Sequence, residues 1–115
     1  MPGARNDSAI IDLSSWLARS GFPVAVAYNF TKGEIEALTR DWATEFGPAG
    51  VRVNMIAPAL IRDPDAGEGA PEETEALMVG TPAGRSGRPE AIAHAAVYIV
   101  SDEAAAYTVP SSCTA

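Results

Sequence analysis

The 115 residues predict an α/β fold built on a parallel sheet. Two short runs, 8–13 and 51–56, have the apolar and β-branched composition of buried parallel strands. Between them lies one long segment, 24–46, with the periodicity of an amphipathic helix. A strand, a helix and a second strand in this order form a right-handed crossover unit, so the two strands should be parallel and adjacent.

The first strand delivers Ser14 and Ser15 at its carboxyl end, which is the end of an open α/β sheet where ligands bind. The long helix carries an apolar stripe at three- or four-residue intervals, made of Ile35, Leu38, Trp42 and Phe46. Its charged residues, Glu36 among them, fall largely off that stripe. The glycines and proline of 47–50 end the helix, since proline cannot continue it.

The rest of the chain divides by composition into four further parts. Residues 1–7 form a turn-rich leader, and 57–84 is a long loop rich in Pro, Gly, Asp and Glu. The loop contains one short helical candidate, Pro71 to Val79. The segment 85–107 contains a helix near 89–100, and 108–115 is an irregular tail whose proline opposes a central strand. We expect all of these to belong to a single partial domain.

Charge and cysteine content narrow the class of protein. With 15 acidic and 8 basic residues the formal net charge is −7, which argues against binding to nucleic acid or an anionic membrane. The one cysteine, Cys113, cannot form an internal disulfide, so no oxidising compartment is needed. No signal-peptide core or membrane-spanning apolar run occurs, so a cytoplasmic location is the default expectation. We predict no metal site.

Tyr28 and Lys32 stand four residues apart, so a helix places them on one face, one above the other. An ammonium at that distance stabilises a phenolate, and a phenol so assisted suits general acid/base catalysis. Ser15 lies thirteen residues upstream of the tyrosine and could donate a hydrogen bond to a substrate oxygen. Each residue alone also fits a plainer role: the pair could be an ordinary helix-surface pair, and the serine a turn or capping hydroxyl.

Four segments in order together resemble the short-chain dehydrogenase/reductase family, here abbreviated SDR. They are Ile-Ile-Asp-Leu-Ser-Ser at 10–15, Tyr-Asn-Phe-Thr-Lys at 28–32, Val-Arg-Val-Asn-Met-Ile-Ala-Pro-Ala at 51–59, and Gly-Arg-Ser-Gly-Arg-Pro-Glu-Ala-Ile-Ala at 84–93. The likeness extends over about residues 8 to 107 and matches the second half of the family's domain only. It implies a partial Rossmann-like, doubly wound parallel sheet.

The resemblance also implies a chemistry: hydride transfer between NAD or NADP and a small alcohol or carbonyl substrate. Tyr28 would be the acid/base, Lys32 would assist it and bind the nicotinamide ribose, and Ser15 would orient the substrate oxygen. Cofactor contacts are implied for Tyr28, Lys32, Pro58, Ala59, Ile61 and Asp63. Ala59 stands where the family usually has glycine, and Asp63 where it often has threonine. The loop 57–84 would close over the substrate.

The family's Gly-x-x-x-Gly-x-Gly motif does not occur within the 115 residues. Those glycines let a backbone approach a pyrophosphate, so we expect impaired dinucleotide binding and activity in this fragment. An alternative is a noncatalytic SDR remnant or interaction module, which would form a homo-oligomer or bind a related subunit. A Ser-His-Asp hydrolase would have His94 as its one candidate base, with no supporting motif.

Overall fold

The computed structural model describes residues 8–21, 23, 25–63, 65 and 75–106. They include strands β1 (Ala9–Leu13) and β2 (Arg52–Ile56), helices α1 (Leu17–Ser20), α2 (Val26–Phe46) and α4 (Pro89–Val100), and 3₁₀ turns Gly47–Ala49 and Asp102–Ala104. The predicted leader, the tail and the first half of the helical candidate at 71–79 lie outside the described residues.

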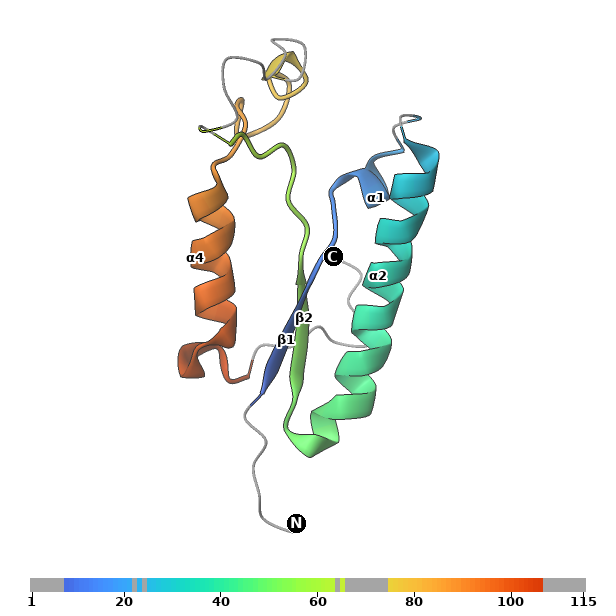
Figure 1. Ribbon diagram of the computed structural model, residues 1–115, viewed down its shortest axis with the longest axis vertical. Coiled ribbons are helices and arrows are strands. Elements are labelled where there is room, and N and C mark those ends of the chain that lie inside the picture. Colours follow the sequence, from blue (N-terminus) through green and yellow to red (C-terminus); the bar gives the residue numbers. More distant parts are fainter. Residues whose placement is uncertain (1–7, 22, 24, 64, 66–74, 107–115) are drawn as a thin grey trace.

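The two strands pair in parallel, with Ala9 opposite Arg52 and Leu13 opposite Ile56. Both α2 and α4 contact both strands, and Figure 1 shows the sheet between the two helices. The described part is therefore a three-layer α/β/α unit, which confirms the predicted parallel, doubly wound arrangement. The carboxyl ends of both strands meet at one edge of the sheet, as parallel pairing requires.

The boundaries of α2 and the existence of α1 depend on left-handed backbone positions. Helix α2 begins at Val26 rather than at 24, because Ala25 has a φ of 57° and cannot belong to the helix. The single turn α1 was not predicted, and it ends at Gly21, whose φ of 65° is the left-handed value that glycine adopts without a Cβ clash.

The buried face of α2 differs from the predicted apolar stripe. Its buried residues are Glu36, Thr39 and Ala43, whereas Leu38 is 43% exposed. The other stripe residues, Ile35, Trp42 and Phe46, are half-buried and flank the contact. The helix is rotated in this way because Glu36 and Thr39 find hydrogen-bond partners on β1 and the residue that follows it.

The core between the layers is small and centred on β2. Val53 and Asn54 are fully buried there, and Ile99 is the buried residue of α4. Two other apolar residues of α4, Val97 and Val100, are exposed. Within the described residues, no helix combines the length and hydropathy that crossing a bilayer would take.

Replacing Thr39 with valine should destabilise the fold, because the Thr39 hydroxyl is fully buried and shares its one proton between Asp12 Oδ2 at 2.8 Å and the Ile35 carbonyl at 2.7 Å. Valine keeps the shape but leaves the Asp12 carboxylate without this donor, so we expect a loss of about 1.5–3 kcal/mol in the free energy of unfolding. The control is Thr44→Val, since the exposed Thr44 hydroxyl contacts only the Arg40 carbonyl of its own helix. Equal losses for both variants in urea unfolding would contradict this account.

Candidate functional site

Ser15 follows β1 and is held by backbone hydrogen bonds on either side. The Ser14 N–H donates to the Ile56 carbonyl at 2.8 Å, and the Trp16 N–H donates to the Pro58 carbonyl at 3.1 Å. Ser15 is buried between these bonds. Its position therefore depends on the strand pairing itself, which fixes the end of β1 against the exit of β2.

The Ser15 hydroxyl has one contact that defines its orientation. The Leu17 N–H, at the start of α1, donates to Ser15 Oγ at 3.3 Å. A hydroxyl that accepts a hydrogen bond keeps its own proton for donation. The Ser15 hydroxyl can therefore donate a hydrogen bond to a molecule bound at the carboxyl ends of the strands.

Lys32 and Tyr28 lie together at the same end of the sheet. Lys32 Nζ donates to the Leu13 carbonyl at 2.9 Å and lies 5.5 Å from the centroid of the Tyr28 ring. Tyr28 is 46% exposed, so its ring is accessible to a bound molecule. The structure thus brings Lys32 to both Tyr28 and the strand end that precedes Ser15, with no hydrogen bond between Ser15 and Tyr28 in the described part of the chain.

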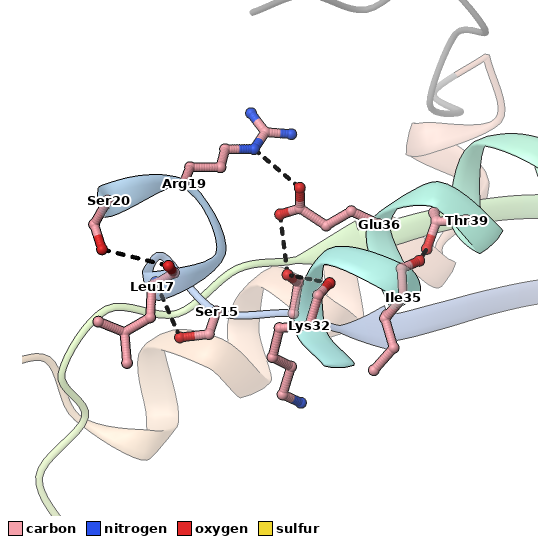
Figure 2. A network of polar contacts seen from close by, with 9 residues as sticks. Ser15, Leu17, Arg19, Ser20, Lys32, Ile35, Glu36 and Thr39 are labelled. Atoms are coloured by element: carbon pink, nitrogen blue, oxygen red, sulfur yellow. Dashed lines mark hydrogen bonds and ion pairs between the residues drawn. The ribbon is translucent and has the colours of Figure 1, made fainter. Parts of the chain in front are cut away.

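A buried carboxylate, which the sequence interpretation left out of the site, connects these parts (Figure 2). The Ser14 hydroxyl donates to Glu36 Oε1 at 3.0 Å, and Arg19 Nε donates to Glu36 Oε2 at 3.0 Å. Glu36 is one helical turn beyond Lys32, and that four-residue spacing is the signal that could have placed it near the site.

Of the residues predicted to contact a cofactor, four follow β2, and the first three are Pro58, Ala59 and Ile61. Pro58 is half-buried, and its carbonyl accepts a hydrogen bond from the Trp16 N–H, whereas Ala59 is exposed. Ile61 pairs with Gly87 in an isolated parallel bridge. A Cβ on Gly87 would lie 2.9 Å from Ile61 Cδ1, so a larger residue there would make the end of the Ile61 side chain shift.

Asp63 lies elsewhere. Its Oδ1 accepts from the Asp65 N–H at 2.9 Å, which ties the carboxylate to its own loop. It lines a cavity of about 750 Å³ together with Arg62, Glu75, Arg85, Ser86, Gly87, Arg88, Glu90, Ala91 and His94. Neither Tyr28 nor Lys32 borders that cavity, whereas Gly87, the bridge partner of Ile61, does.

Comparison with known proteins decides the family. The family model described as enoyl-(acyl carrier protein) reductase matches residues 1–111. The chain belongs to the short-chain dehydrogenase/reductase family. One SDR relative is the inactive 2-(S)-hydroxypropyl-CoM dehydrogenase 2 of Xanthobacter autotrophicus, 36% identical over 110 residues that make up 90% of this chain and 48% of the relative.

Two further proteins are similar over the same region. The 3-oxoacyl-[acyl-carrier-protein] reductase of Thermotoga maritima is 31% identical over 105 residues, 90% of this chain and 42% of the reductase. The solved structure of angucycline C-6 ketoreductase LanV with bound NADP superposes with a TM-score of 0.81 at 29% identity, over 90% of this chain and 40% of LanV. This SDR chain therefore spans less than half the length of the relatives named here.

The residues of this SDR chain fit one end of a nicotinamide dinucleotide. The Lys32 ammonium has three N–H groups, of which the Leu13 contact uses one, so it could also bind ribose hydroxyls. The Tyr28 ring beside it is exposed to solvent. Asp63 Oδ1 accepts from its own loop, and a cofactor contact of this residue stays a prediction.

Glu75 gives the loop next to α4 a pH dependence. The Ser86 hydroxyl donates to its carboxylate at 2.6 Å and the Ser86 N–H at 2.9 Å, and these bonds lower the pKa of Glu75 below its ordinary value of 4.5. Because the pKa is lower in the folded than in the unfolded chain, the contact stabilises the fold above pH 4.5. That contribution is lost as the pH falls through the folded-state pKa.

Carboxyl ¹³C NMR of Glu75 should therefore give a titration midpoint below 4.5, and Ser86→Ala should raise it toward 4.5. The control is Ser101→Ala, whose hydroxyl contacts only the Tyr98 carbonyl and should leave the midpoint unchanged. An unchanged midpoint in Ser86→Ala would contradict the assignment of the shift to Ser86.

Proposed function

We propose that this chain carries the catalytic part of an NAD(P)-dependent oxidoreductase that acts on a small alcohol or carbonyl substrate. The observation that supports it most is the placement of Lys32. Its ammonium donates a hydrogen bond to the carbonyl of Leu13, two residues before Ser15, and lies 5.5 Å from the centroid of the Tyr28 ring. Family membership supports the reaction type, and the NADP bound in LanV supports the class of cofactor.

In the proposed reaction Tyr28 and Ser15 act at the substrate oxygen, and Lys32 acts on Tyr28. When bound, NADH or NADPH supplies a hydride to the carbonyl carbon. Tyr28 gives its phenolic proton to the carbonyl oxygen as the alcohol forms, and takes a proton from the alcohol in the reverse direction. The positive charge of Lys32 stabilises the resulting phenolate. Ser15 donates a hydrogen bond that holds the same oxygen in place.

The proposal includes an impaired activity of the 115 residues by themselves. Lys32 and Tyr28 can hold the nicotinamide riboside end, but the sequence contains no Gly-x-x-x-Gly-x-Gly segment for the pyrophosphate. The choice between NAD and NADP belongs to contacts outside these residues. A reaction that draws on the cellular dinucleotide pool fits the cytoplasm, the compartment we propose.

A hybrid reductase tests the proposed function. Residues 8–106 replace the matching segment of the Thermotoga maritima 3-oxoacyl-[acyl-carrier-protein] reductase, so that the host supplies the rest of the domain. We expect the hybrid to bind NADPH and to oxidise it in the presence of a short 3-oxoacyl thioester. A hybrid that binds NADPH, as followed by nucleotide fluorescence, but reduces no carbonyl substrate would contradict the proposal.

The second candidate function is a noncatalytic SDR module that associates with a second copy or a related subunit. The exposed apolar side chains of the two long helices favour it: Val26, Phe30 and Leu38 on α2, and Val97 and Val100 on α4. The hybrid distinguishes them, because a purely structural module would support no turnover.

A further inference from the structure

Glu36 is a buried charge at the interface of α2 with the end of β1. Only 6% of the residue is exposed, and its carboxylate is held by the Ser14 hydroxyl and by Arg19 Nε, each at 3.0 Å. Burying a paired charge rarely stabilises a fold more than a well-packed apolar residue does. Its presence here therefore needs a reason other than stability, and its partners suggest one.

The two hydrogen-bond partners of Glu36 lie on either side of Ser15 in the chain. Ser14 precedes it directly, and the Ser14 hydroxyl also lies 3.4 Å from the Lys32 carbonyl. Arg19 belongs to α1, the turn whose first N–H, from Leu17, donates to Ser15 Oγ. Through its two oxygens, Glu36 thus ties α2 both to the residue before Ser15 and to the turn that orients the Ser15 hydroxyl (Figure 2).

A second tie from the same helix acts one turn earlier. Lys32 Nζ donates to the Leu13 carbonyl. Side chains of α2 are therefore hydrogen-bonded to both Leu13 and Ser14, the two residues just before Ser15. Tyr28 lies on the same helix, one further turn back. The distance between the Ser15 hydroxyl and Tyr28 consequently depends on these two hydrogen bonds, which hold the end of β1 against α2.

We propose that Glu36 is a positioning residue that sets where the Ser15 hydroxyl stands relative to Tyr28 and Lys32, acting through Ser14 and Arg19. The inference rests on the proposed function, in which Tyr28 and Ser15 act at one substrate oxygen and Lys32 acts on Tyr28. Glu36 does not touch the substrate. Arg19 carries the opposite charge and donates to the second carboxylate oxygen at 3.0 Å, which makes this a charge-assisted hydrogen bond.

Amide hydrogen exchange on the 115-residue protein tests the inference. In Glu36→Ala we expect exchange of the Leu17 and Ala18 N–H groups, which bond to Ser15, to rise by about tenfold to a hundredfold. Amides of α4 should keep their rates. Glu36→Gln should restore most of the protection, because its amide oxygen can still accept from Ser14.

The control is Glu34→Ala, which removes an exposed carboxylate from the same helix and should change neither set of amides. If Glu36→Ala does not fold, Ser14→Ala carries the test, since it removes one tie and leaves the Arg19 pair intact. Unchanged exchange at Leu17 and Ala18 would overturn the inference, and so would an equal rise throughout α4. The exchange experiment uses neither substrate nor dinucleotide, so its result does not depend on turnover. A hybrid without turnover would contradict the proposed function, and the exchange rates would still decide whether Glu36 orders the turn after Ser15.

Discussion

Replacing Tyr28 with phenylalanine in the hybrid reductase should lower kcat by about 10²–10⁴-fold, the range that a positioned acid/base contributes. Phenylalanine keeps the ring beside Lys32 Nζ but removes the one phenolic proton placed there. The KM for the carbonyl substrate should change far less, since the ring and its surroundings remain. Steady-state rates with saturating NADPH measure both quantities.

Tyr98→Phe is the matched control for this substitution. Tyr98 is also about half exposed but lies on α4, away from the Tyr28–Lys32 pair, and its replacement should leave kcat within about twofold, as surface substitutions usually do. Wild-type turnover by Tyr28→Phe would mean that the pair on α2 is an ordinary helix-surface pair.

The 115-residue protein without a host should bind NAD and NADP with dissociation constants weaker than about 1 mM. Lys32 and Tyr28 offer contacts to one end of the dinucleotide, whereas the pyrophosphate carries the charge that a glycine-rich turn would bind. Isothermal titration calorimetry measures the affinity directly. Micromolar binding would show that residues of the loop 57–84 or of the tail 108–115 bind the pyrophosphate in place of that turn.

The same purified sample should also self-associate. Each strand of the two-stranded sheet has one edge without a neighbouring strand among the described residues, and such edges invite pairing. Phe30, 68% exposed on α2, adds apolar area worth about 25 cal/mol per Å² when buried. Sedimentation velocity should show dimers or larger species, and Phe30→Ser should shift them toward monomer more than Leu77→Ser does. A compact monomer at all concentrations would contradict this expectation.

Local sequence patterns predicted the layers of this fold well. The apolar runs gave both strands, and proline at the start of α4 marked its first turn at the observed residue. The four-residue spacing of Tyr28 and Lys32 correctly predicted that they share a face, because that spacing is fixed by helix geometry. Their catalytic role stays a prediction.

What the sequence did not reveal depends on contacts between distant segments. Apolar periodicity selected Leu38 as inward-facing, yet the contact of α2 with β1 is made by Glu36 and Thr39. Ser14 and Glu36 are 22 residues apart, so no local window contains both partners. The left-handed Ala25, which delays the start of α2, is equally invisible to propensity because alanine rarely adopts that conformation.

Hydride transfer to a carbonyl carbon is the step that we propose for this chain. Its most direct test is to supply the hybrid reductase with NADPH carrying deuterium at the transferable C4 position and to analyse the alcohol product by mass spectrometry and NMR. The account predicts one deuterium on the carbinol carbon, formed at a rate that falls by about 10²–10⁴-fold in Tyr28→Phe. Product without deuterium at that carbon, or labelling at the same rate in both proteins, would contradict it.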